Sequence, residues 1–284
     1  MEHDPPGSPS AEARHVEGLE IELLLSGIAK RYGYHFENYS RPSLTRRVRR
    51  AVRDEGLSTV SALQERVLHD PRCMSRFVET ISVHTTSMFR DPDVYRTIRS
   101  DVVPILRTYP FVRIWHAGCS SGEEVYSLAI VLHEAGIYER CRIYATDLSD
   151  SVLDRARKGI FPLRAMRDHT AAYQRASGTE DFSSYYSADA ENVVFRASLR
   201  RNLIFSQHNL VCDAAFNEFQ LILCRNVVIY FDDALRTRVH ELFYNSLPKL
   251  GLLVLGKRES LRATRVEPFY QEVVPGLRIF RRMH

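Results

Sequence analysis

Apolar positions in the first third of the chain recur at helical spacing. The leucine and isoleucine positions between Leu19 and Ile28 form one stripe, which predicts a first helix. Three further stripes predict helices at the following positions: 43–55, 58–68 and 71–81. Ser43 and Ser58 are the expected N-caps of the first two of these helices. We therefore expect residues 17–88 to form an all-helical domain.

From residue 111 onward, short apolar runs alternate with helical stripes. The runs predict strands at 112–117, 142–145, 219–224 and 252–255. The stripes between most of them predict helices at 124–134, 151–158 and 234–247. Strands that alternate with helices are typical of an α/β fold with a doubly wound, mainly parallel sheet. We expect this fold over residues 89–284.

The alternation breaks between residues 161 and 207. Two short β-like pieces occur there, at 193–195 and 203–206, on either side of a basic turn. We interpret them as a small antiparallel β insertion in the α/β domain, at about residues 185–207.

Composition places the chain among globular proteins. It has 284 residues and 44% hydrophobic content. No apolar run approaches the roughly 20 residues of a membrane span, so we expect no membrane insertion. Residues 1–16 are polar and proline-rich, which predicts a disordered tail without the apolar centre of a signal peptide. The five cysteines are scattered, which favours reduced thiols in the cytoplasm and predicts neither a disulfide framework nor a metal site.

The segment 112–130 contains the most informative motif. The predicted strand runs into a loop of small residues, Gly118 to Gly122, and a helix follows. Strand, small-residue loop and helix in this order make the nucleotide crevice of doubly wound sheets. Glu123 and Glu124, directly after the loop, would repel a phosphate but suit a cation or a sugar hydroxyl. S-adenosylmethionine (SAM) fits this pattern, because it carries a sulfonium, an ammonium and a ribose and no phosphate.

An acid ends the second predicted strand. Asp147 follows Gly122 by 25 positions (147 − 122). In doubly wound sheets an acid about 20 residues after the loop can hold the ribose hydroxyls of a nucleoside. The alternative is that Asp147 caps the helix that starts near Ser149.

Two polar residues interrupt the third apolar run at its carboxyl end. Arg225 and Asn226 lie where open α/β sheets bind their ligands. Burying such groups without partners costs about 1–3 kcal/mol each. A ligand should therefore satisfy them, or else a structural network with Asp232 or Asp233.

The segment 84–92 joins the two parts of the chain. Asp91 and Pro92 fit the N-cap and the first position of a following helix. This role does not explain the polar row 84–86 or Arg90, which would suit an anionic carboxylate at a domain junction. His84 taken alone fits a structural histidine better than a functional one.

These motifs, in this order, resemble the chemotaxis receptor methyltransferases, the CheR-type protein-glutamate O-methyltransferases. The most specific are T-x-x-F-R-D at 86–91, S-x-G-E-E-x-Y-S at 120–127 and C-R-N-V-x-I-Y-F at 224–231. The resemblance covers residues 18–280. It implies SAM as cofactor, S-adenosylhomocysteine as product, a helical N-terminal domain and an inserted three-stranded subdomain.

The resemblance also implies roles for single residues. The cofactor-binding positions are His84, Thr86, Arg90, Glu123, Glu124, Asp147, Asn209, Leu210, Arg225 and Asn226. Thr86 and Arg90 match contacts to the methionine part of the cofactor, and Asn209 and Leu210 line the adenine pocket. His84 stands where many members have asparagine. The sequence does not separate the two glutamates of the loop.

Tyr230 and Arg90 are the candidate catalytic residues. Tyr230 matches a tyrosine close to the transferred methyl group. A substrate glutamate, with a pKa of about 4.3, is already a carboxylate at neutral pH. It can attack the methyl group without a general base, and orientation alone can supply roughly 7–11 kcal/mol. Tyr230 is therefore expected to position the reacting groups.

Four arginines share one face of the second predicted helix. Arg46, Arg49, Arg50 and Arg53 are spaced i, i+3, i+4 and i+7, in a chain whose net charge is only +4. They form either a solvated basic face or a docking surface. The resemblance favours docking of the acidic cytoplasmic helices of methyl-accepting chemoreceptors.

Two other functions fit parts of the sequence. A nucleic-acid methyltransferase could use the arginines to bind phosphates, but the chain has no Asn-Pro-Pro-Tyr-like motif and no basic groove with interleaved aromatic residues. A non-catalytic scaffold could keep the cofactor fold within a signalling array. We expect a monomeric enzyme with no nucleic-acid partner.

Overall fold

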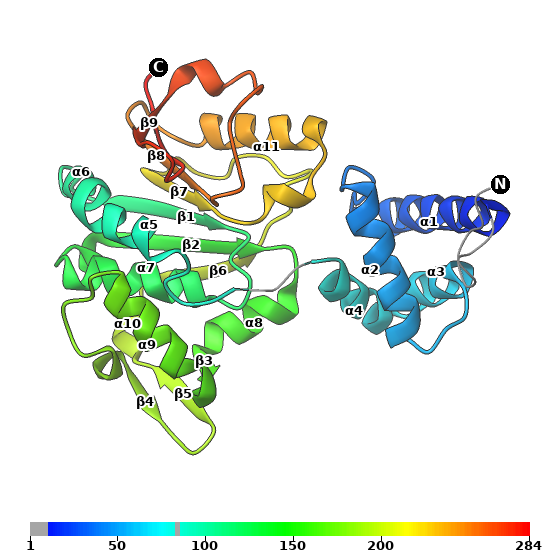
Figure 1. Ribbon diagram of the computed structural model, residues 1–284, viewed down its shortest axis with the longest axis horizontal. Helices are drawn as coiled ribbons and strands as arrows, with labels where there is room; N and C mark the ends of the chain where they lie inside the picture. Colours follow the sequence, from blue (N-terminus) through cyan, green and yellow to red (C-terminus); the bar gives the residue numbers. More distant parts are fainter. Residues whose placement is uncertain (1–10, 83–85) are drawn as a thin grey trace, which may run out of the picture. The chain divides into compact units, whose positions relative to one another are not determined.

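The computed structural model describes residues 11–82 and 86–284 (Figure 1). The chain divides into two compact units after residue 83. The predicted tail falls partly on residues 1–10, which lie outside the described residues. Its other part, 11–16, is helical, because the alanine and glutamate residues there are good helix formers.

Over the described residues 11–82, the first unit consists of four helices. They are α1 (Ala11–Tyr32), α2 (Arg41–Asp54), α3 (Val60–His69) and α4 (Pro71–Ile81). Helix α1 packs on α3, and α4 packs on both α2 and α3. The predicted apolar stripes face this shared core, in which Leu24, Val48 and Leu63 are fully buried. All four predicted helices are confirmed.

Two predicted caps are wrong. Thr59 is the N-cap of α3, and its hydroxyl accepts a 3.1 Å hydrogen bond from the Ala62 N–H. Ser40 occupies the N-cap position of α2, so Ser43 lies inside the first turn. Serine and threonine occur at several neighbouring positions in both segments, and the apolar stripe alone does not select among them.

The second unit contains a seven-stranded sheet in the order β6-β2-β1-β7-β8-β10-β9. Its strands are β1 (Val112–Ala117), β2 (Cys141–Asp147), β6 (Leu203–Gln207), β7 (Leu221–Cys224), β8 (Leu252–Leu255), β9 (Tyr270–Val274) and β10 (Ile279–Arg282). The first five strands in this order are parallel, and β10 and β9 add an antiparallel edge. The predicted doubly wound α/β fold is confirmed.

Helices cover both faces of this sheet (Figure 1). They are α5 (Pro92–Thr97), α6 (Val103–Leu106), α7 (Glu123–Glu134), α8 (Asp150–Lys158), α9 (Met166–Arg175), α10 (Ala197–Arg200) and α11 (Asp233–Asn245). Ile114 of β1 belongs to the core that α7 shares, whereas Trp115 stacks edge-on against Phe243 of α11. Alternate side chains of one strand thus fill the two layers. No helix in the described ranges is long and apolar enough to cross a membrane.

A second sheet of three antiparallel strands is inserted after α8. Its strands are β3 (Ile160–Pro162), β4 (Tyr186–Ala188) and β5 (Asn192–Phe195), in the order β3-β5-β4. The predicted boundaries of this insertion, residues 185–207, are wrong at both ends, because its three strands lie between Ile160 and Phe195. Residues 203–207 form β6, which pairs in parallel with β2 and lies at the edge of the main sheet. An edge strand is only partly buried, so it lacks the continuous apolar run that marks the central strands.

Candidate active site

The loop after β1 is tied to the end of β2. Gly118 and Cys119 both donate their N–H groups to the carbonyl of Thr146, at 2.8 and 2.9 Å. Gly118 has a φ of +71°, and a Cβ there would lie 2.4 Å from a methyl group of Val227. Only glycine fits this position, which brings the loop against the segment after β7.

Asp147 is held by the same loop. Its Oδ2 accepts a 2.8 Å hydrogen bond from the Ser120 N–H, and its Oδ1 accepts a 3.2 Å bond from the Ser149 N–H. A carboxylate has about four acceptor positions, so two remain for ribose hydroxyls. Ser149, not Asp147, is the N-cap of α8. The ribose-binding role stays a prediction, and two backbone donors hold the carboxylate at the end of β2.

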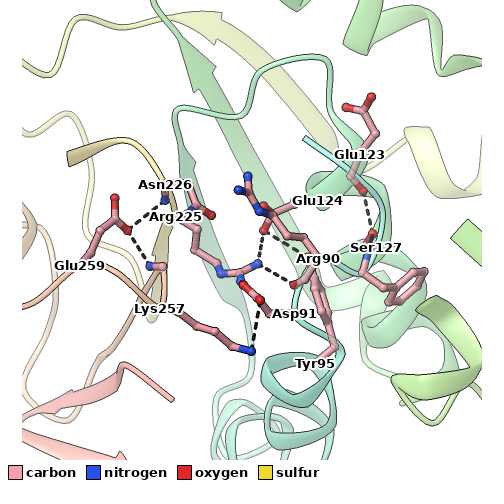
Figure 2. Close-up of polar contacts among 12 residues, drawn as sticks. Arg90, Asp91, Tyr95, Glu123, Glu124, Ser127, Arg225, Asn226, Lys257 and Glu259 are labelled. Carbon is pink, nitrogen blue, oxygen red and sulfur yellow. Dashed lines mark hydrogen bonds and ion pairs between the residues drawn. The ribbon is translucent and has the colours of Figure 1, made fainter. Parts of the chain in front are cut away.

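The structure separates the two glutamates that the sequence left equivalent. Glu124 is buried and its Oε2 lies 2.5 Å from Nη1 of Arg225 and 3.4 Å from the Tyr95 hydroxyl. Glu123 instead accepts a 2.7 Å hydrogen bond from the Ser121 hydroxyl and points away from Arg225 (Figure 2). Burial raises the pKa of Glu123. Because Glu124 is engaged by Arg225, Glu123 is the better candidate for a cofactor contact.

Arg225 is the centre of a buried polar network (Figure 2). Its side chain is 1% exposed. Besides Glu124, its guanidinium binds the carbonyl of Arg90 at 3.1 Å and the carboxylate of Asp91 at 2.6 Å. Burial opposes its charge, but the acidic partners outweigh burial and raise the pKa of Arg225 above its usual value. Asp91 also pairs with Lys257, at 3.2 Å.

Two sequence-based expectations change with this network. The alternative partners Asp232 and Asp233 are wrong: Asp232 caps α11 through the Leu235 N–H, and Asp233 pairs with Arg236. Asp91 does occupy the N-cap position of α5, but its carboxylate makes no capping bond, because it is engaged by Arg225.

The segment 86–91 is anchored from two sides. The Phe89 N–H donates to the Ser127 hydroxyl of α7 at 2.9 Å, and the Arg90 carbonyl accepts from Arg225. Thr86 and Arg90 are both half-buried. His84 lies outside the described residues, so its predicted contact stays a prediction.

The segment after β6 borders the end of β2, which carries Asp147. The His208 N–H donates to the Asp147 carbonyl at 3.1 Å. The side-chain oxygen of Asn209 accepts from the Val211 N–H at 3.0 Å, and Leu210 is buried. The two predicted adenine-pocket residues therefore lie next to the predicted ribose acid.

Two buried oxygen atoms at this edge of the sheet lack partners. Within the described residues, neither the Ser120 hydroxyl nor Oδ1 of Asn226 has a hydrogen bond. Buried polar atoms are normally satisfied. A hydroxyl that can donate and an amide oxygen that can accept fit the carboxylate, ammonium and ribose groups of a SAM molecule, so the site suits this cofactor.

Glu259 is a site residue that sequence reasoning missed. It follows β8, is 3% exposed, and accepts hydrogen bonds from the N–H groups of Gly256, Asn226 and Val227, at 2.6, 3.0 and 2.8 Å. Burial raises the pKa of Glu259, and these backbone donors oppose the rise.

The candidate catalytic residue Tyr230 lies at the end of a 3₁₀ turn, Val228–Tyr230, which comes after β7 in the chain. Its side chain is half-buried.

The predicted docking arginines lie on α2 in the first unit. All four are exposed, but Arg49 is bound through two hydrogen bonds by Glu17, at 2.7 and 2.5 Å. Arg50 lies 3.3 Å from Asp54. Over residues 11–82 and 86–284, Arg46 and Arg53 pair with no acid. The basic face exists, and half of it is neutralised by the protein itself.

The fold and the site define a SAM-dependent methyltransferase. Its first five parallel strands follow the order of doubly wound nucleotide-binding sheets, and its crevice combines acids with a small-residue loop. The chain belongs to the CheR methyltransferase family. The family's SAM binding domain matches residues 84–274, and its all-alpha domain matches residues 19–82. The predicted family and the SAM cofactor are confirmed.

Individual relatives agree with this assignment. A Pseudomonas putida protein named "Putative methyltransferase Cher3" is 46% identical over 264 residues, which cover 93% of this chain and 97% of the relative. A Listeria innocua "Chemotaxis protein methyltransferase" is 27% identical and covers 87% of this chain and 92% of its own length. One from Borreliella burgdorferi is 31% identical over 66% of this chain and 68% of its own.

Proposed function

We propose that the chain transfers the methyl group of SAM to glutamate side chains of a chemoreceptor or a related signalling protein, forming methyl esters. The names of the relatives support a role in chemotaxis signalling. The choice of a carboxylate substrate rests on the pKa values and ion pairs of the titratable groups around Arg225.

Three titratable groups around Arg225 are poorly suited to remove a proton. Burial lowers the pKa of His116 to about 4, so this histidine is neutral and weakly basic at neutral pH. Burial, and then the charge of Glu124, raise the pKa of Tyr95. Glu124 itself is paired with Arg225. A substrate that already carries its negative charge needs none of these groups as a base.

The residues of the site then have the task of binding SAM and orienting it toward the substrate carboxylate. SAM supplies an electrophilic methyl group when it is bound. We assign Asp147 to the ribose hydroxyls, Asn209 and Leu210 to the adenine, and Thr86 and Arg90 to the methionine carboxylate. We further assign Glu123 to the ammonium group.

Tyr230 is proposed to position the reacting carboxylate. Tyr230→Phe keeps the ring and removes the hydroxyl. We expect kcat to fall by about tenfold, the worth of one hydrogen bond made in the transition state, with unchanged affinity for S-adenosylhomocysteine. Equal kcat values in the two proteins would remove Tyr230 from the mechanism.

The decisive experiment follows a labelled methyl group. The full chain is incubated with SAM labelled in its methyl group and with the cytoplasmic fragment of a chemoreceptor. Label on the receptor that is released as methanol by mild base supports a glutamate methyl ester. A receptor fragment with its methylation-region glutamates changed to alanine is the control. Label on nucleic acid, or cofactor binding without transfer to the receptor, would contradict the proposal.

A further inference from the structure

The carboxylate of Glu259 occupies a backbone anion site. Asn226 is in the left-handed region, with φ +61°, and Val227 follows in the right-handed helical region. Successive residues of opposite hand turn their N–H groups to one side and form a concave anion-binding nest. The N–H groups of Asn226 and Val227 donate to the Glu259 carboxylate, at 3.0 and 2.8 Å. Figure 2 shows the contact with Asn226. The protein thus fills this nest with its own anion.

This contact joins the ends of two neighbouring strands. Glu259 follows β8, whereas Asn226 and Val227 follow β7. A Cβ at Gly256 would lie 2.8 Å from both the Asn226 nitrogen and Oε2 of Glu259. The glycine is required for this close approach, so the two loops are built around the carboxylate.

The segment that Glu259 holds carries two groups of the proposed site. Asn226 presents its Oδ1 there, which has no hydrogen-bond partner among the residues that the structure describes. Tyr230 ends the turn that starts at Val228. We propose that Glu259 is a positioning residue for methyl transfer, which fixes Asn226 and Tyr230 through the backbone without touching the cofactor. The part that concerns Tyr230 rests on the proposed function.

Glu259→Gln tests this inference. Glutamine has nearly the same shape, but it replaces one acceptor oxygen with an NH₂ group that faces N–H donors. We expect affinity for S-adenosylhomocysteine, measured by calorimetry, to fall about tenfold, the effect of losing one charge-assisted hydrogen bond. Amide hydrogen exchange at Asn226 and Val227 should accelerate.

The chain offers a matched control. Glu272 accepts hydrogen bonds from the N–H groups of Gly276 and Arg278, at 3.0 and 3.1 Å, between β9 and β10. Glu272→Gln makes the same change in β9, beside the turn that leads to β10, and we expect it to leave cofactor affinity unchanged. If Glu259→Gln does not fold, Gly256→Ala disturbs the same contact through the backbone directly after β8 and should weaken binding as well.

A double-mutant cycle tests the link to Tyr230. If Glu259 acts on turnover through Tyr230, Glu259→Gln should reduce kcat less in the Tyr230→Phe background than in the wild type. If the double variant shows the product of the two single reductions in kcat, the two residues act independently and this link is overturned. A folded Glu259→Gln protein with wild-type cofactor affinity would overturn the inference, even if the receptor is methylated. A wild-type protein that binds S-adenosylhomocysteine but labels no receptor contradicts only the proposed function.

Discussion

Arginine side chains have different roles in the two units of this protein. In the second unit, Arg225 is almost fully buried and bound by Glu124, Asp91 and a backbone carbonyl. In the first unit, Arg46 and Arg53 are exposed on α2, and the described residues provide no acid for either. The motif in which an arginine occurs therefore does not fix its role. Burial and partners decide whether it holds the protein together or is available to another molecule.

The buried arginine should give the largest effect. Arg225→Met leaves the buried carboxylate of Glu124 unpaired, and breaking such a pair costs about 3–5 kcal/mol of unfolding free energy. The loss should be measurable in urea unfolding. Cofactor affinity should also fall, because Arg225 holds the carbonyl of Arg90.

A compensating variant sharpens this prediction. Replacing both partners, as in Arg225→Met with Glu124→Leu, removes the unpaired charge, and such apolar pairs are often as stable as the ion pair. We expect most of the stability to return and the cofactor affinity to stay low. Recovery of both would mean that the network contributes only to folding and does not position the segment 86–91.

The exposed arginines should give a smaller effect of another kind. Arg46→Gln with Arg53→Gln should leave stability and cofactor affinity unchanged and raise KM for the receptor by about three- to tenfold at low salt. Rim charges mainly change association rates and their salt dependence. The KM of the variant for the receptor should therefore depend less on salt concentration than the KM of the wild type.

Lys30→Gln with Arg31→Gln provides the control for net charge. Both residues are exposed in the last turn of α1, so the charge change is the same and the position differs. Equal shifts in KM for the two double variants would show that total charge, not the α2 face, governs receptor binding.

The sequence predicted the central strands well and the partners of single residues poorly. Strands β7 and β8 are buried along their whole length, so their apolar runs are unambiguous. Strand β6 lies at an edge, and its mixed pattern of apolar and polar residues predicts the wrong sheet for it. Adjacent residues such as Glu123 and Glu124 point in different directions from a helix, but only the fold shows which one meets Arg225, 101 positions away.

The docking prediction shows the same limit. Helical spacing correctly placed four arginines on one exposed face of α2. It could not show that Glu17, 32 positions from Arg49, neutralises one of them. Glu259 was missed for a related reason, because its partners are backbone N–H groups, which leave no pattern in the sequence.

The ion pair between Arg49 and Glu17 should give the smallest effect. The hydrogen bond from Arg49 is the main cause that lowers the pKa of Glu17. A lowered pKa in the folded state means that this stabilisation is present above the ordinary glutamate pKa and is lost as the pH falls through the folded value. Exposed pairs contribute about 0.2–1 kcal/mol. Glu17→Gln should therefore lower the stability slightly at pH 7, and the difference from the wild type should shrink as the pH falls below the ordinary glutamate pKa. A difference in unfolding free energy that does not change with pH in acid would show that Glu17 stabilises α1 by packing instead of charge.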